Sequence, residues 1–397
     1  MSKLNIPKIF IIHLGFSGFP IGNAEVQRIK LNFKSLKLAG FFPLIFNKYS
    51  INKAENRKRL NRIDGIPYVY TSHLVNRPDS FLKRNLNKLT GLIGEFTLLR
   101  KKRKKIHTAI LYTPHFTELV YYRILSSLLG FKLIIQYVEF RSAIEQRHKS
   151  IYRFNDWLFD NYFYKFCDGV IAISEFLRAH SISKDKNIPI LKLPVVCDFN
   201  NLLMNGSPKE TNYLMYCGTI AYIEVIEFII EIFTSFKNNN NHSEKLVMVI
   251  SGNGETGWSK LNSLLESNTY KEDIIIKSNI KYEELVSLYS HAEVLLIPLR
   301  DNIQDTARFP HKIGEYTASK RPILSNNVGE LKFYFQDCKS ALLVEEYSVE
   351  AFVKKLTSVL GSKNLLNNFG KAGYGVGIKY FDYKAQADEL KRFILHL

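Results

Sequence analysis

Residues 294–325 read VLLIPLRDNIQDTARFPHKIGEYTASKRPILS. The apolar runs Val294–Pro298 and Pro322–Leu324 are typical of buried parallel strands, which carry apolar side chains on both faces. Between them, the residues around Lys312–Ser319 predict a helix. A strand, a helix and a second strand in this order form a parallel β–α–β unit, so the stretch predicts an α/β fold.

The same alternation extends outward from this stretch in two series. The segment Leu193–Pro208 separates them; it mixes Pro, Asn, Gly and Ser without periodicity and is interpreted as a linker. We therefore expect two Rossmann-like domains, residues 1–200 and 201–375, facing each other across a cleft, and a C-terminal helix within 376–397 that packs back on the first. The predicted strands are Lys8–Leu14, Phe42–Phe46, Ile66–Tyr70, Ala109–Tyr112, Leu133–Val138, Gly169–Ile173, Tyr213–Cys217, Leu246–Ile250 and Ile274–Ile276, besides the two above. The predicted helices are Ala24–Leu38, Thr117–Leu129, Glu175–His180, Tyr282–His291 and Lys384–Leu397, besides Lys312–Ser319 and one that follows Gly218-Thr219 and ends near Lys237.

The composition excludes several classes of protein. The chain has 397 residues, of which 46% are hydrophobic and 23% charged, as in a soluble globular protein. Its four cysteines form no Cys-x-x-Cys pair, which argues against a zinc ribbon or a dithiol redox site. The N-terminus lacks a signal-peptide pattern, and no charge-free apolar run reaches the roughly 18 residues of a membrane span. We expect a cytoplasmic protein with reduced thiols.

The net charge of +18 is concentrated in the first half of the chain. Residues 1–200 hold 33 Lys and Arg against 14 Asp and Glu, whereas residues 201–397 hold 22 against 23. A Lys-rich composition alone does not explain this asymmetry, which points to an anionic partner of the first domain. The run Arg100, Lys101, Lys102, Arg103, Lys104 and Lys105 follows the amphipathic stretch Phe81–Leu89 and predicts docking on an anionic membrane; a solvated basic loop is the alternative.

Four loops that follow predicted strands carry the candidate site residues. In open α/β sheets ligands bind at the carboxyl ends of the strands, where glycines let the backbone approach a phosphate or a sugar. The first three loops contribute Gly22, the pair Gly218 and Thr219, and the pair Gly252 and Gly254. The fourth, Arg308–Tyr316, opens a helix with Arg308 and Lys312 close by, which is a good seat for a diphosphate.

Taken together, these stretches resemble the retaining GT-B glycosyltransferases of family 4, especially capsule and lipopolysaccharide transferases. The resemblance covers nearly the whole chain and is strongest between residues 282 and 325. It is carried by Phe309-Pro310-His311-Lys312-Ile313-Gly314-Glu315-Tyr316, by Lys320-Arg321-Pro322-Ile323-Leu324, by Tyr289-Ser290-His291-Ala292-Glu293 with the strand after it, and by Asp168–Glu175.

The resemblance implies a role for each candidate residue. Glu315 would hold the donor ribose, Arg308 and Lys312 would lie near the phosphates, and Phe309 and Pro310 would line the donor site. Gly22, Gly218, Thr219, Gly252 and Gly254 would contribute loop backbone, and His115 or Glu139 would face the sugar from the first domain.

Two departures from the family pattern affect this assignment. The first Glu of the family's paired motif falls at Ala307, and the segment Ala221–Val225 after Gly218 has no basic residue. Either Arg308 or Arg300 substitutes for the missing cation, the donor is unusual, or activity is lost.

The function we expect is sugar transfer from a nucleotide-sugar donor to a glycan or lipid-linked acceptor, with retention of configuration, in cell-surface polysaccharide synthesis at the inner face of the cytoplasmic membrane. The sequence offers no cluster of metal ligands and no Asp-x-Asp, so no cofactor and no metal are expected. A second reading is an inactive GT-B protein that acts as a partner in a glycan-assembly complex. A nucleic-acid-binding protein is the third, but no RNA- or DNA-binding motif accompanies the basic residues, so nucleic acid is not an expected partner.

Overall fold

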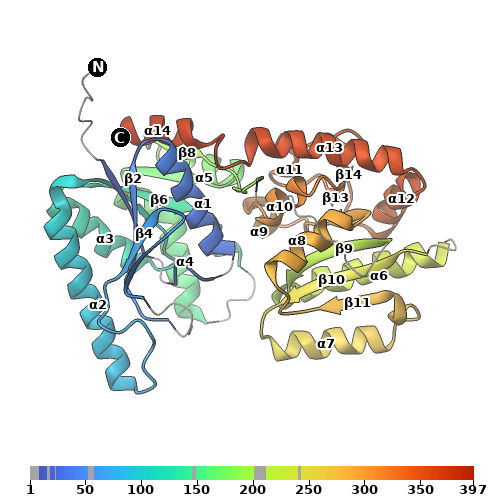
Figure 1. Cartoon of the computed structure of the whole chain (residues 1–397), viewed down its shortest axis with the longest axis horizontal. Coiled ribbons are helices and arrows are strands. Elements are labelled where there is room, and N and C mark those ends of the chain that lie inside the picture. The colour runs from blue at the N-terminus through green and yellow to red at the C-terminus, as the bar shows by residue number, and fades with distance from the viewer. Residues whose placement is uncertain are drawn as a thin grey trace. The chain divides into compact units, whose positions relative to one another are not determined.

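The structure is a computed structural model that describes residues 9–15, 18–22, 24–51, 58–144, 149–200, 212–239 and 243–397. The chain forms two compact units (Figure 1). Unit 1 comprises Met1–Val196 together with Tyr383–Leu397, and unit 2 comprises Cys197–Asp382.

Unit 1 is built on one eight-stranded sheet. Its strands are β1 (Phe10–Leu14), β2 (Phe42–Asn47), β3 (Leu60–Ile63), β4 (Ile66–Tyr70), β5 (Ile106–Leu111), β6 (Lys132–Tyr137), β7 (Gly169–Ala172) and β8 (Ile190–Lys192). Their order is β3-β4-β2-β1-β5-β6-β7-β8, and β3 alone pairs antiparallel, with β4. The chain moves from β1 outward through β2, and later returns to the other side of β1 with β5, so the strand order reverses between β1 and β5.

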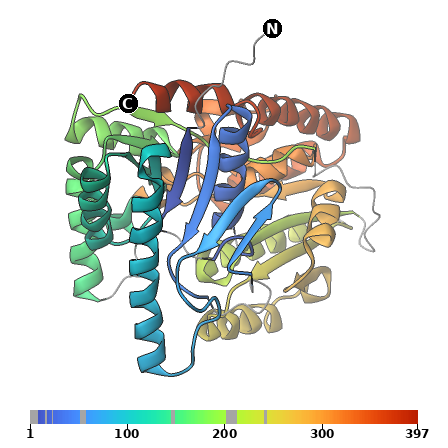
Figure 2. The same ribbon diagram turned by 60° about the vertical axis from the view of Figure 1, so that its left-hand side comes forward.

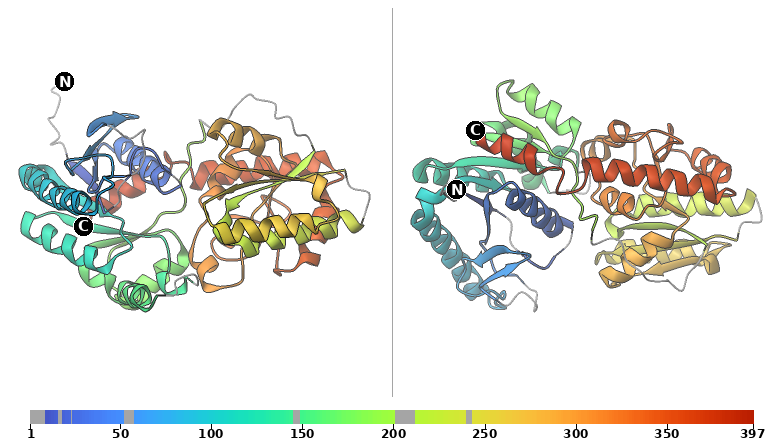
Figure 3. Two further views of the ribbon diagram at one scale, coloured as in Figure 1. Left: turned by 90° about the horizontal axis from the view of Figure 1, so that it is seen from below. Right: turned by 45° about the horizontal axis from the view of Figure 1, so that its top comes forward.

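Helices cover both faces of this sheet (Figure 3). They are α1 (Ala24–Leu38), α2 (Phe81–Lys102), α3 (Phe116–Leu129), α4 (Ser150–Tyr162), α5 (Glu175–Lys184) and α14 (Ala387–Leu395), with 3₁₀ turns at Arg103–Lys105, Arg141–Ala143 and Phe163–Phe166. Helix α1 buries Val26, Ile29, Phe33 and Leu36, which recur at helical spacing on one face. The C-terminal helix α14 joins this cluster through Leu390 and Ile394.

Unit 2 contains a six-stranded sheet in the order β11-β10-β9-β12-β13-β14, in which all the recorded strand pairs are parallel. The strands are β9 (Tyr213–Thr219), β10 (Lys245–Ser251), β11 (Ile274–Lys277), β12 (Val294–Leu296), β13 (Ile323–Asn326) and β14 (Leu342–Val344). The chain moves from β9 through β10 to β11 and then crosses to β12 on the other side of β9. The strand order therefore reverses between β9 and β12.

The helices of unit 2 range from four to 18 residues in length. They are α6 (Ile223–Asn239), α7 (Glu255–Glu266), α8 (Tyr282–His291), α9 (Ile303–Ala307), α10 (Lys312–Ala318), α11 (Leu331–Tyr334), α12 (Val349–Val359) and α13 (Lys363–Tyr380), with 3₁₀ turns at Ile220–Tyr222 and Lys271–Asp273. Helix α6 packs between α7 and α12, and α10 packs against α13. The core joins Ile226, Ile229 and Phe233 of α6 to Met248 and Ile250 of β10.

The predicted α/β fold with two parallel sheets is confirmed. Each predicted strand overlaps an observed one, whereas β3, β8 and several helices were not predicted. The chain changes units at Val196 and Tyr383 and not at residues 200 and 376, because α13 still packs on α10 of unit 2. The predicted linker residues 201–208 lie outside the described residues, and the expected cleft between the domains stays a prediction.

No described helix is both long enough and apolar enough to cross a bilayer.

Candidate active site

The loops at the strand-order reversal of unit 2 carry its chemistry. Ligands of open parallel sheets bind at the carboxyl ends of the strands where the order reverses, here β9 and β12. After β9 the chain continues as Ile220–Tyr222, and after β12 it continues to Arg300. Both Arg300 and Arg308 extend their guanidinium groups to the Tyr222 ring, 5.7 and 4.4 Å from its centroid. Two guanidinium groups thus contact the loop after β9, whose own residues Ile220–Tyr222 include no Lys or Arg.

A buried carboxylate fixes both arginines. Asp305 of α9 is fully buried, and its Oδ2 accepts hydrogen bonds from the backbone N–H of Arg300 at 2.8 Å and from Arg300 Nε at 3.1 Å. Its Oδ1 lies 2.9 Å from Arg308 Nη2. Asn302 caps α9 by accepting from the Asp305 N–H at 2.8 Å, which holds this carboxylate in place. One negative charge therefore positions two positive ones.

The two arginines differ in how many of their N–H groups already have partners within the protein. Arg300 also donates to Gln304 at 3.2 Å and lies 3.5 Å from Glu224. The buried Nε of Arg308 has no hydrogen-bond partner among the described residues. Arg308 therefore keeps a buried donor for a ligand, while Arg300 is mostly committed to the protein.

The predicted glycine loops come together beside this cluster. Gly252 has φ +104°, and a Cβ at this position would lie 2.9 Å from Thr219 Oγ1. Ser251 Oγ donates to the carbonyl of Gly218 at 3.2 Å, and Gly254 packs near Ile220. The structure thus brings Gly218, Thr219, Gly252 and Gly254 to the carboxyl ends of β9 and β10.

Lys312 and Glu315 lie on α10 near the end of β9. The Tyr316 hydroxyl accepts from the Cys217 N–H at 3.0 Å, which anchors α10 to the strand, and Lys312 reaches the Cys217 thiol. Glu315 accepts hydrogen bonds from Tyr282 at 3.2 Å and Tyr289 at 3.3 Å. Burial raises the pKa of the Glu315 carboxyl, and Lys312 and the two tyrosines partly oppose this. Glu315 is thus a partly exposed, rigidly held acceptor at this edge of the sheet.

Phe309 has a different role from the one expected. Its ring is buried and packs 5.6 Å from Tyr334 and 5.5 Å from Phe381 between ring centroids. The side chain therefore supports the loop from within and cannot line a donor site. Pro310 is half-buried and accepts from the Ile313 N–H through its carbonyl at the start of α10.

The strand-order reversal of unit 1 holds a second polar cluster. Asn47 at the end of β2 accepts from the N–H groups of Gly18 and Phe19 at 3.0 and 3.1 Å, which orders the chain that leads to Gly22. A Cβ at Gly15 would lie 2.3 Å from the carbonyl oxygen of Tyr112, so only glycine permits this approach to the loop after β5. Phe16, Ser17 and Asn23 of the predicted loop lie outside the described residues.

Side chains of α1 meet the loops after β5 and β6 in this cluster. The Arg28 guanidinium lies 4.8 Å from the Tyr112 ring centroid, and Tyr112 hydrogen-bonds Glu25. Burial raises the pKa of Glu25, and Arg28 opposes this while Glu139 adds to it. His115, the exposed N-cap of α3, and Glu139 follow the adjacent strands β5 and β6. Sequence reasoning singled out His115 and Glu139 but missed Glu25 and Arg28, which lie one helical turn apart in α1.

Within the described residues, no three His, Cys, Asp or Glu side chains gather as a metal site would require.

Comparison with known proteins assigns the second unit. Residues 204–376 match the family model described as Glycosyl transferases group 1. Unit 2 is a glycosyltransferase domain. A sequence search among curated proteins found no match.

Solved structures extend the likeness to the whole chain. Sucrose-phosphate synthase from Thermosynechococcus elongatus superposes with a TM-score of 0.73 at 14% identity, covering 98% of each chain. HepE from Anabaena in complex with UDP gives 0.66 at 11% identity, covering 98% of this chain and 100% of its own. WaaG, a glycosyltransferase involved in lipopolysaccharide biosynthesis, gives 0.64 at 13% identity over 97% and 99%. The chain therefore has the GT-B fold of these structures, and the glycosyltransferase match lies in its unit 2.

The two departures noted in the sequence can be located in unit 2. Ala307 ends α9 and is fully buried, so its position cannot present even a substituted side chain to a ligand without rearrangement. The segment after Gly218 has no basic residue, but the ring of Tyr222 in this segment contacts the guanidinium groups of Arg300 and Arg308, which follow β12 in the chain. Sequence reasoning raised both Arg300 and Arg308 as substitutes; it missed Asp305 and Tyr222, although Asn302 three residues before Asp305 is a helix-capping signal.

The basic run Arg100–Lys105 is helical and not a loop. Arg100, Lys101 and Lys102 form the last turn of α2, and Arg103, Lys104 and Lys105 form the 3₁₀ turn after it. All except the half-buried Lys102 are exposed.

Proposed function

We propose that this glycosyltransferase binds a nucleotide-sugar donor at the strand-order reversal of unit 2 and transfers its sugar to a glycan or lipid-linked acceptor bound by unit 1. The observation that carries the proposal is the cation cluster at the ends of β9 and β12. Arg300 and Arg308 are both held by the buried Asp305, Lys312 lies at the start of α10, and the buried Nε of Arg308 has no partner among the described residues. A diphosphate is the ligand such a cluster fits best.

The same cluster would supply most of the catalysis. As the bond between the sugar and the diphosphate breaks, negative charge gathers on the leaving group and an oxocarbenium-like sugar develops. Cations already held at the diphosphate stabilise that charge without having to reorganise. Arg308 and Lys312 take this role, Glu315 accepts hydrogen bonds from the donor ribose, and the backbone of Gly218, Thr219, Gly252 and Gly254 lines the site. This machinery needs neither a cofactor nor a metal.

Unit 1 would present the acceptor. His115 and Glu139 lie on adjacent strand ends, where they could face the transferred sugar, and Gly22 lies in the neighbouring loop. The acceptor hydroxyl attacks from the side of the departing diphosphate, so the anomeric configuration is retained. The likeness to HepE bound to UDP and to UDP-glucose makes UDP the first nucleotide to test.

We further propose that the chain acts at the inner face of the cytoplasmic membrane in capsule or lipopolysaccharide synthesis. The exposed basic run Arg100–Lys105 supports this location, because each basic residue near anionic lipid contributes about 1 kcal/mol. WaaG, with a similar fold, acts in lipopolysaccharide biosynthesis.

One experiment tests the transferase proposal. The melting temperature of the chain is measured with UDP, GDP, ADP, CMP and TDP sugars. A rise with one nucleotide, lost in Arg308→Gln, supports donor binding at the cluster. No rise with any of them favours the second reading, an inactive GT-B protein that serves as a partner in glycan assembly, which the buried Ala307 also favours. Release of free sugar from the bound donor would exclude that reading.

A further inference from the structure

Helix α2 of unit 1 turns its apolar face to solvent, whereas the apolar face of a helix in a globular protein is normally buried. Its buried residues are Asn87, Gly91, Glu95 and Leu99, of which three are polar or lack a side chain. Its apolar residues face solvent: Leu82 is 78% exposed, Leu86 62% and Ile93 59%. Leu82, Leu86, Leu89, Ile93 and Phe96 are spaced alternately by four and three residues and therefore form one stripe along the helix, which we call the α2 stripe.

Specific contacts on the inner face fix this orientation. The side chain of Asn87 accepts from the N–H of Leu74 at 2.8 Å and donates to its carbonyl at 3.0 Å. A Cβ at Gly91 would lie 2.2 Å from the carbonyl oxygen of Lys48, and one at Gly94 2.3 Å from that of Thr71. If the helix rotated to bury the stripe, large side chains would collide with the backbone carbonyls of Lys48 and Thr71, which the two glycines now approach closely. The outward position of the stripe is therefore built into the packing.

A buried charge network strengthens this arrangement. Glu95 is fully buried and accepts from the Tyr122 hydroxyl at 3.0 Å. Lys48 lies close to Glu95 and 2.7 Å from Glu118 of α3. This carboxylate on the inner face is held by Lys48, which follows β2, and by Tyr122 of α3.

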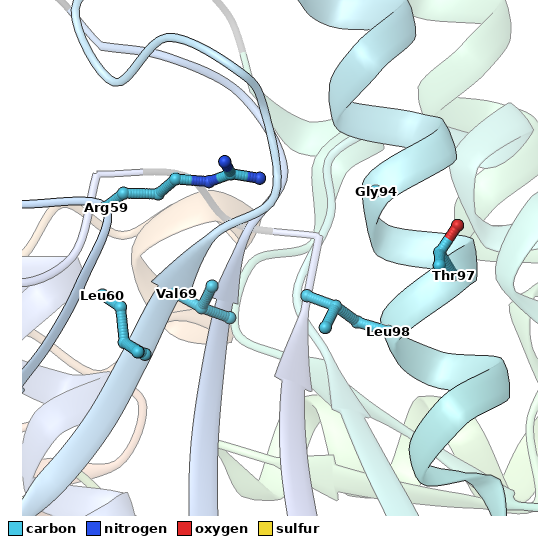
Figure 4. A pocket seen from close by; sticks show the side chains of 6 residues that line it. All are labelled: Arg59, Leu60, Val69, Gly94, Thr97 and Leu98. Atoms are coloured by element: carbon cyan, nitrogen blue, oxygen red, sulfur yellow. The ribbon is translucent and has the colours of Figure 1, made fainter.

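An apolar groove of about 470 Å³ runs along the flank of the same helix. Leu60 and Val69 of β3 and β4 line one side, and Gly94, Thr97 and Leu98 of α2 line the other. Figure 4 shows Leu98 and Val69 facing each other across the groove, with Arg59 extending toward the helix. Helix α2 lies on the outside of unit 1 (Figure 2), and its neighbour α3 also exposes Ile124 and Leu128.

The positive charge of α2 indicates which kind of surface can bind the α2 stripe. The helix carries Lys83, Arg84, Lys88, Arg100, Lys101 and Lys102, and its sole acidic residue is the buried Glu95. A second copy of the helix, parallel or antiparallel, would place basic side chains against basic side chains. An anionic lipid surface instead complements the charges and takes up apolar side chains at the same time.

We infer that the α2 stripe inserts into an anionic bilayer and, with the adjoining groove, forms the membrane-docking surface of unit 1. The inference deepens the membrane location proposed above and rests on it. Basic residues attract the chain to the surface, and the apolar stripe retains it there. The groove alongside has the lining and the size to take part of a lipid acyl chain.

The test uses the full chain and vesicles of phosphatidylcholine alone or mixed with phosphatidylglycerol, separated by flotation. In Leu82→Gln/Leu86→Gln/Ile93→Gln, binding to the mixed vesicles should fall by at least about tenfold, because three exposed apolar side chains no longer leave water. Phe333→Gln/Leu365→Gln/Ile378→Gln changes three exposed apolar residues of unit 2 and should bind as the wild type does. Unchanged melting temperatures would show that both variants fold.

The possible outcomes separate this inference from the proposals on which it rests. If the α2 variant binds as the wild type does while the variant with Arg100–Lys105 changed to Gln is released, docking stands and stripe insertion is refuted. If the wild type binds neither vesicle, both fail. If light scattering shows that the wild type is a dimer that the α2 variant dissociates, the stripe is an interface between copies. Nucleotide binding should be the same in the α2 variant and in the Arg100–Lys105 variant, since the donor cluster lies in unit 2.

Discussion

Exchange of Arg308 for Gln should weaken donor binding far more than it weakens the fold. The guanidinium makes one ion pair, at 2.9 Å to Asp305, and stacks on Tyr222, while its buried Nε has no partner among the described residues. A charge-assisted contact with a diphosphate contributes about 1.5–3 kcal/mol. Loss of that contact corresponds to a roughly 10- to 150-fold increase in the Kd for UDP or for whichever nucleotide binds. Asp305 keeps its contacts with Arg300, so the free energy of unfolding should fall by only about 1 kcal/mol.

Exchange of Arg300 for Gln should lower the free energy of unfolding more than it weakens nucleotide binding. This side chain donates to both oxygens of the fully buried Asp305, at 3.1 and 3.3 Å, so its loss leaves a buried carboxylate with half of its partners. Breaking such a pair costs about 3 kcal/mol of unfolding free energy. Nucleotide affinity should fall less than in the Arg308 variant.

Titration calorimetry with UDP and urea unfolding of each variant measure the two effects. Lys355→Gln is the matched control, because it also removes one positive charge from unit 2. Lys355 lies on α12 and pairs with Asp337, neither of which belongs to the donor cluster. It should leave the Kd unchanged. The reasoning is refuted if Arg308→Gln binds nucleotide within about twofold of the wild type, or if Arg300→Gln loses affinity without losing stability.

Three other variants test single features of the two units. Burial raises the pKa of Glu95 to about 7. Because this exceeds the unfolded value, unit 1 gains stability as pH falls from above 7 toward about 4.5; urea unfolding followed by Trp157 fluorescence should show a change of up to roughly 3 kcal/mol, absent in Glu95→Gln. Gly91→Ala should lower the free energy of unfolding by about 1–3 kcal/mol in urea unfolding, since its Cβ would meet a backbone carbonyl. Gly375→Ala, with open space around it, should be neutral or slightly stabilising. Glu315→Gln should raise the Kd for UDP about tenfold in calorimetry, because a carboxylate accepts hydrogen bonds from a ribose diol more strongly than an amide; an unchanged Kd would remove Glu315 from the ribose site.

The strands and the edge that carries the site follow from the sequence, because buried parallel strands are short apolar runs that end at Gly or Pro. Gly218, Gly252 and Lys312 were singled out from this pattern, and in the structure they lie at the end of β9, directly after β10 and at the start of α10. The five-residue helix α9 has too few turns to show a periodicity, so Asp305 could not be recognised as the residue that positions both arginines.

The sequence predicted a docking surface on Phe81–Leu89, but it did not reveal the contacts that hold the apolar face of α2 outward. Periodicity shows that a helix has an apolar face, and that face is normally buried. Here close backbone approach at Gly91 and the pairing of Glu95 with groups far away in the chain decide the orientation. Such contacts join residues tens of positions apart and leave no local pattern. The predicted boundary at residue 376 lies before the observed one at Tyr383 for a similar reason, because α13 packs on α10 of unit 2 and α14 packs on α1 of unit 1.

The return of the chain to unit 1 at Tyr383 has a consequence for synthesis on the ribosome. Every residue of unit 2 emerges before α14, whose Leu390 and Ile394 cover apolar side chains of α1. Until translation reaches these last residues, the first-made half of the nascent polypeptide keeps an uncovered apolar surface, while the later-made half can already be complete. To express unit 1 by itself, Val196 must be spliced to Tyr383, and a gene simply cut after the first half would encode an aggregation-prone product.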